Sequence, residues 1–148
     1  MGTRYLSASM GIGKSEIIMN TYESYLKHEA GNIITIEECM EIYSQLVESI
    51  SLCTLEDKDE FWNEFIDRAA RYTYIRNQWE TMSTEEKMAA EDGRTQAHNV
   101  VITALNTLAR IVEREGGDAS WRLKLGDHRK RIGDFACFVS YITGISNR

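Results

Sequence analysis

The sequence predicts an all-α, single-domain bundle of five or six helices, and three observations favour it. The 148 residues include no proline, a residue that helix interiors exclude and that turns and strand edges commonly use. Apolar residues recur at three- and four-residue spacing, without the sustained alternation of a strand. Capping signatures and glycine breaks divide the chain into segments of helical length. We therefore expect a flexible lead over residues 1–14 and one helical domain over residues 15–148.

The first part of the chain contains three predicted helices. The first spans residues 15–29. Thr35 and Glu38 have capping-box spacing at the start of the second, and Thr54 and Asp57 repeat this spacing ahead of the third. The two apolar stripes consist of Ile36, Met40, Tyr43, Val47 and Ile50, and of Phe61, Phe65, Ala69, Tyr72 and Trp79.

The central part contains a fourth predicted helical segment. Ser83 and Glu86 have capping-box spacing at its start, and we expect Gly93 to interrupt it. A helix over residues 95–115 follows. Its apolar stripe consists of Val101, Leu105, Leu108 and Val112.

The last part contains a short helical turn and a final helix. Asp118 is the expected cap of the turn, Gly126 ends it, and Asp127 is the expected cap of the final helix. The apolar stripe of the final helix consists of Ile132, Phe135, Val139 and Ile142.

The cysteines predict a reducing environment. Cys39, Cys53 and Cys137 are odd in number and lie among apolar neighbours, which indicates buried free thiols rather than disulfides or a structural zinc site. No apolar run approaches the roughly 20 residues that a bilayer-spanning helix needs. From the free thiols we expect a cytoplasmic protein, and from the short apolar runs one that does not cross a membrane. Since no metal-binding cysteine pattern is present, we also expect no cofactor.

Charge is unevenly distributed along the chain. Residues 1–92 carry 8 Lys and Arg against 18 Asp and Glu, whereas residues 93–148 carry 9 against 5. An acidic and a basic half attract each other within one chain or between two copies. This pattern is equally consistent with pairing inside one chain and with head-to-tail association of two copies.

Five carboxylates form two short acidic motifs. Glu37, Glu38 and Glu41 make an EExxE pattern in the second helix, and Glu64 and Asp67 make an ExxD pattern in the third. Over residues 37–67 this arrangement resembles the all-α nucleoside triphosphate pyrophosphatases of the MazG kind. The resemblance implies that the carboxylates hold Mg²⁺, which activates water and binds the phosphates. Capping and i, i+4 ion pairs on a solvated helix face explain the same residues without a metal.

Two polar residues continue the apolar stripe of the helix over residues 95–115. Arg94 and His98 lie in line with Val101, which places them on the core-facing side, where buried polar groups need partners. The alternative is that this end of the stripe is exposed at the rim of the bundle. His128 heads the stripe of the final helix in the same way. If these two helices are antiparallel neighbours, the two histidines lie at opposite ends and form no dyad.

Arg129, Lys130 and Arg131 form a basic patch at the start of the final helix. Such a patch contacts nucleic-acid phosphates through charge. The acidic net charge of −6 and the lack of a recognition-helix pattern speak against nucleic-acid binding. Pairing with the acidic second and third helices is the alternative.

Residues 92–98 and 125–136 resemble segments of small helical proteins of Gram-positive bacteria, and this resemblance implies a helical fold but no particular activity. Three tryptophans and seven tyrosines favour protein contacts, since both residue types are enriched at interfaces. We expect a non-enzymatic protein-interaction module that forms homodimers. The alternatives are an Mg²⁺-dependent pyrophosphohydrolase and a nucleic-acid-binding protein that uses the basic patch.

Overall fold

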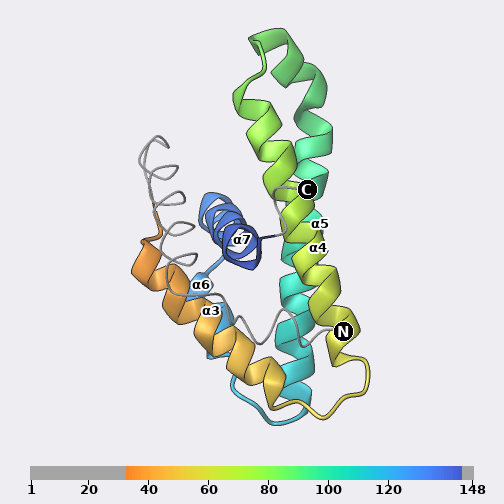
Figure 1. Cartoon of the computed structure of the whole chain (residues 1–148), viewed down its shortest axis with the longest axis vertical. Coiled ribbons are helices and arrows are strands. Elements are labelled where there is room, and N and C mark those ends of the chain that lie inside the picture. Colours follow the sequence, from red (N-terminus) through yellow and green to blue (C-terminus); the bar gives the residue numbers. More distant parts are fainter. Residues whose placement is uncertain (1–32, 145–148) are drawn as a thin grey trace.

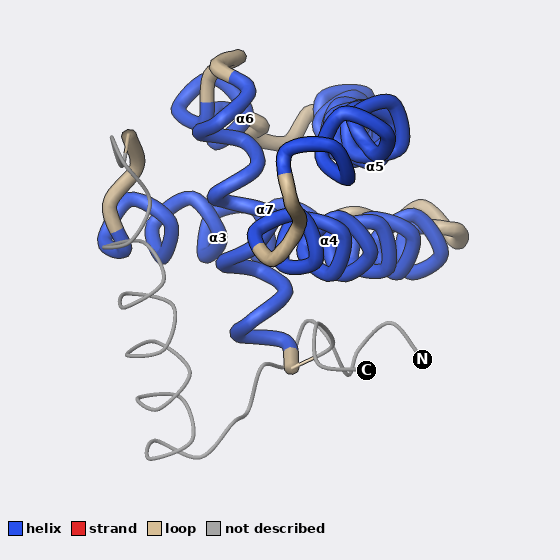
Figure 2. Tube along the Cα trace, turned by 90° about the horizontal axis from the view of Figure 1, so that it is seen from above, coloured by secondary structure: helices blue, strands red, loops and turns tan. Residues whose placement is uncertain are grey.

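The computed structural model describes residues 33–144, and within them it contains α-helices and no strand (Figures 1 and 2). This confirms the predicted all-α bundle. The helices are α3 (Ile36–Ser51), α4 (Lys58–Glu80), α5 (Thr84–Arg114), α6 (Ser120–Leu125) and α7 (Arg129–Thr143). The predicted lead over residues 1–14 and the predicted helix over residues 15–29 lie outside the described residues. No helix among the described residues is long and apolar enough to cross a membrane.

The longest two helices form a hairpin that supports the rest of the fold. A short connection over residues 81–83 joins α4 to α5, and the two helices pack along each other. Figure 1 shows α7 nearly end-on beside the upright hairpin, so α7 crosses it, and its main packing partner is α4. Helix α3 packs mainly against α6.

Aromatic side chains join these layers in one core. The Tyr43 ring on α3 contacts Trp62 on α4 and Phe138 on α7, with ring centroids 6.2 and 6.4 Å apart. Trp121 on α6 is fully buried, and its indole N–H donates to the Ser49 hydroxyl on α3 at 3.0 Å. Each large apolar side chain buried in this way contributes about 1.5–3 kcal/mol. The three cysteines are buried and free, as predicted.

The predicted helix starts are confirmed at two positions and wrong at three others, where Thr54, Asp118 and Asp127 are not the caps of the helices that follow. Thr35 and Ser83 each form a complete capping box, with Glu38 and Glu86 respectively. Thr54 does not cap α4. Its backbone N–H and hydroxyl instead donate to the Glu115 carboxylate at 2.7 and 2.8 Å, from 61 residues away. These bonds lower the pKa of Glu115.

The cap of α7 is also not the predicted one. His128, rather than Asp127, is the residue that precedes the helix, and its Nδ1 accepts a hydrogen bond from the Lys130 backbone N–H at 3.2 Å. The Asp127 carboxylate instead accepts from Arg122 at 3.1 Å. Gly126 does end α6, with the positive φ of 76° that glycine adopts easily.

Two further expectations about helix faces and continuity are wrong. Helix α5 runs without interruption through Gly93, because one glycine costs a long helix only about 1 kcal/mol. The buried face of α3 is turned relative to the predicted stripe, so that Met40 is 50% exposed and Leu46 is buried. The α6 contact through Trp121 lies on that turned face.

Candidate functional site

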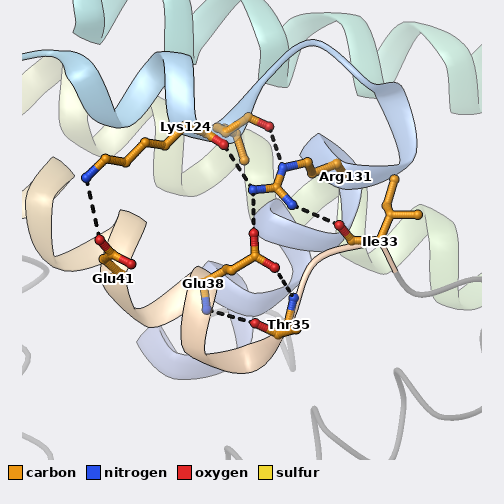
Figure 3. A network of polar contacts seen from close by, with 7 residues as sticks. Ile33, Thr35, Glu38, Glu41, Lys124 and Arg131 are labelled. Atoms are coloured by element: carbon orange, nitrogen blue, oxygen red, sulfur yellow. Dashed lines mark hydrogen bonds and ion pairs between the residues drawn. The ribbon is translucent and has the colours of Figure 1, made fainter.

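The five acidic residues of the two predicted metal motifs lie in separate surroundings. Glu38 is held at the start of α3, where its carboxylate accepts from the Thr35 backbone N–H and from Arg131 (Figure 3). Glu41 lies one turn further on, with Lys124 Nζ 3.5 Å from its carboxylate (Figure 3). Glu37 is exposed.

The other two carboxylates belong to α4. Glu64 forms an i, i+4 ion pair with Arg68, and Glu64 and Asp67 line a shallow hollow along α4 that also contains Arg71. Helix α4 packs mainly against α5 and α7, whereas α3 packs mainly against α6. The structure therefore does not bring the two motifs together, and residues 33–144 contain no group of three His, Cys, Asp or Glu side chains that could hold a metal ion.

The three residues of the basic patch point to two opposite sides. Arg131 serves as a clamp: its guanidinium donates to Glu38 at 2.8 Å and to the backbone carbonyls of Ile33, Lys124 and Leu125 at 2.8–2.9 Å (Figure 3). This joins the start of α3, the end of α6 and the start of α7. The Arg131 hydrogen bond is also the main reason why the pKa of Glu38 is lowered.

Arg129 and Lys130 turn to the opposite side, towards the hairpin. Arg129 donates to the Asn99 side-chain oxygen on α5 at 3.0 Å, and Lys130 Nζ lies 3.7 Å from the Asp134 carboxylate. Both residues line a cleft of about 620 Å³ between the α4–α5 hairpin and the beginning of α7, which we call the cleft. Its lining residues are Tyr72, Arg76, Glu80, Glu91, Arg94, Thr95, His98, His128, Arg129 and Lys130.

The cleft is predominantly basic. Four of its lining residues are Arg or Lys and two are His, against two Glu. Beside Arg76 and Lys130 lies Asp134, which is fully buried and accepts from Arg76 at 2.7 Å. Even when Asp134 is included, the cations outnumber the carboxylates.

The ion pair between Arg76 and Asp134 was not predicted as a unit, although each residue leaves a signal in the sequence. Arg76 follows Tyr72 and Thr73 on the buried stripe of α4, and Asp134 interrupts the apolar run of α7. A charged residue at a core position needs a partner. Because these two lie 58 residues apart, their pairing depends on how α4 and α7 cross.

His98 is 6% exposed and has a defined tautomer. Its Nε2 lies 2.7 Å from the Arg129 backbone carbonyl, and because a carbonyl only accepts, Nε2 must carry the proton. Its Nδ1 is then a bare acceptor, buried and without a partner among the described residues. Burial is the main reason why the pKa of His98 is lowered, which favours the neutral ring.

The structure corrects the expectation that the two histidines lie at opposite ends. His98 and His128 line the same cleft, because α7 crosses the hairpin instead of running beside α5 and only its first turn reaches the middle of α5. The prediction that Arg94 and His98 continue the core-facing stripe is accurate for His98. Arg94 is one third exposed and lies over the Trp79 ring, 4.6 Å from its centroid.

Comparisons with models of known protein families, with curated proteins and with solved structures find no match for this chain.

Proposed function

We propose that this protein acts by binding, as a non-enzymatic module that pairs with a second copy of itself through the projecting end of the α4–α5 hairpin. We call this end, residues 77–96, the arm. The observation that carries the proposal is that no residue of the arm is buried. The last buried residue of α4 is Arg76, and the first of α5 is Ala97. Figure 1 shows the hairpin extending past the other described helices.

The arm is held in shape by local interactions instead of a core. The Ser83–Glu86 capping box begins α5, and Trp79 contacts two cations, Lys87 at 5.9 Å and Arg94 at 4.6 Å from its ring centroid. Such contacts contribute about 0.5–1 kcal/mol each at exposed sites. Short helices are marginal in water without tertiary packing, so an ordered projecting hairpin favours a partner that packs on it.

The surface of the arm suits a second copy of this chain. Two large apolar side chains are exposed near it, Tyr74 at 52% and Met88 at 76%. The arm carries five acidic and two basic residues, whereas residues 97–148 carry 8 Lys and Arg against 5 Asp and Glu. The acidic arm and the basic C-terminal segment over residues 97–148 are complementary between two copies, and a twofold dimer would pair both arms at once.

Light scattering after size exclusion tests the proposal. At micromolar concentration we expect a dimer, and we expect Tyr74→Asp with Met88→Asp to shift the protein to monomer. Leu123→Asp is the matched control, because Leu123 on α6 is 85% exposed and lies away from the arm. The proposal fails if the unsubstituted protein is a monomer at 100 µM, a concentration on the order of the Kd of a weak interface. It also fails if the Leu123 variant dissociates as readily as the variant with Tyr74→Asp and Met88→Asp.

A further inference from the structure

The cleft, to which the arm contributes Glu80, Glu91, Arg94 and Thr95, has features of a ligand site that the proposed dimer does not explain. Its volume of about 620 Å³ lies within the range of roughly 300–1,000 Å³ that is typical of small-molecule sites. It lies where three helices meet: α4 and α5 form one wall, and the first turn of α7 forms the other. Two arginines in its lining, Arg94 and Arg129, are oriented by groups that are not carboxylates.

Two arginines of the cleft are held in place by contacts other than close hydrogen bonds to carboxylates. Arg94 lies over Trp79, 4.6 Å from the ring centroid, and its Nε has no hydrogen-bond partner among the described residues. Its ion pair with Glu91 is long, at 3.8 Å. Arg129 is oriented by a neutral group, the Asn99 amide oxygen at 3.0 Å. Fixing a guanidinium in advance reduces the entropy lost when it binds a ligand.

His98 adds a buried acceptor to these donors. Its Nε2–H donates to the Arg129 backbone carbonyl, so its Nδ1 can only accept a hydrogen bond. No group in the described part of the chain donates to Nδ1. Tyr72 packs edge-on against the imidazole, with ring centroids 5.3 Å apart, and fixes its plane. A ligand that satisfies this cleft therefore carries an anionic group for the arginines and a hydroxyl or N–H group for His98.

We propose that the cleft binds a small organic phosphate monoester. A phosphate accepts several hydrogen bonds at once and matches the forked donors of arginine. This favours it over a single carboxylate at a site lined by Arg94, Arg129 and Lys130. An inorganic phosphate ion fills only part of the cleft. The organic portion occupies the remainder, beside Thr95 and His98. Nδ1 is closed to solvent in this structure, so a sugar-like hydroxyl donates to it after a small shift of the side chains around it.

Titration of the full chain with ribose 5-phosphate, followed by amide chemical shifts in NMR spectra, tests this site. We expect saturable shifts at Thr95, His98 and Arg129, weaker binding of inorganic phosphate at the same residues, and no binding of ribose. Arg129→Gln should weaken binding about tenfold or more, the usual cost of one charged hydrogen bond. Arg94→Gln should do the same. Because the Arg129 backbone carbonyl is unchanged in the Arg129 variant, the bond to His98 remains.

Arg110→Gln is the matched control, since Arg110 is exposed on another face of α5 and lines a different hollow. The site is refuted if ribose 5-phosphate at millimolar concentration gives no saturable shifts. It is also refuted if ribose binds as tightly as ribose 5-phosphate, or if inorganic phosphate binds more tightly than it does. A third refuting result is that Arg110→Gln weakens binding as much as Arg129→Gln does. Light scattering on the same samples separates this proposal from the dimer. A monomer that binds ribose 5-phosphate refutes only the dimer, and a dimer that does not bind it refutes only the site.

Discussion

Replacing Arg76 by methionine removes one partner of a buried ion pair and leaves the Asp134 carboxylate in the core. Arg76 is 5% exposed and Asp134 is fully buried, so water cannot take the place of the lost guanidinium. Breaking such a pair from one side typically costs about 3–5 kcal/mol. Lys130 lies 3.7 Å from the same carboxylate and offsets part of this cost, so we expect a loss of about 3 kcal/mol.

Equilibrium unfolding in urea measures this loss. With a slope of about 1.5 kcal/mol per molar urea, typical of small domains, a loss of about 3 kcal/mol lowers the midpoint by roughly 2 M. The matched control is Arg68→Met, which breaks the half-exposed pair with Glu64 and should cost only about 0.3–0.5 kcal/mol beyond the change in helix propensity.

A double substitution separates loss of the charge pair from loss of packing. Arg76→Met combined with Asp134→Asn removes both charges, so the double variant should be about 1–2 kcal/mol more stable than Arg76→Met alone. Our reasoning is refuted if Arg76→Met costs less than about 1 kcal/mol, or if the double variant is no more stable than that single variant.

Two further predictions concern the same crossing of α4, α5 and α7. A Cβ on Gly133 would lie 2.6 Å from the buried Tyr72 hydroxyl, so Gly133→Ala should destabilise the fold by about 1–2 kcal/mol, and Tyr72→Phe should partly rescue it. Gly93→Ala, with no atom within 4 Å of the added Cβ, should instead stabilise the fold by about 0.5–1 kcal/mol. Urea unfolding that ranks the two alanine variants the other way contradicts this packing. Because burial lowers the pKa of His98 below its ordinary 6.5, the unfolded chain takes up a proton on acidification that the folded chain does not. The free energy of unfolding should therefore fall as pH decreases below about 6.5, and His98→Gln should reduce this fall between pH 7 and pH 5. An identical pH dependence in both proteins would show that His98 is not its source.

Local signals in the sequence predict the helices well and some of their ends poorly. The Thr35 and Ser83 caps are accurate because both partners of a capping box lie within one turn. The Thr54 cap is wrong because Glu115, remote in sequence, competes for the same donors. The predicted break at Gly93 is wrong because a glycine in a long helix lowers stability without ending the helix.

The candidate site could be predicted only in part. A polar residue on an apolar stripe is visible in the sequence, and it led to Arg94 and His98. The pairing of Arg76 with Asp134, and the meeting of His98 with the start of α7, depend on the crossing of α7 over the hairpin, which helical periodicity does not encode. For the same reason the basic patch could not be divided in advance into the Arg131 clamp and the cleft residues Arg129 and Lys130.

Amide hydrogen exchange of the arm tests the proposed role of this protein most directly. Exchange over residues 84–96 is compared between a dilute and a concentrated sample at the same pH and salt. If a second copy packs on the arm, these amides exchange more slowly in the concentrated sample, while amides of the core part of α7 are unchanged. Arm exchange that is equally fast at both concentrations would mean that no second copy covers this surface.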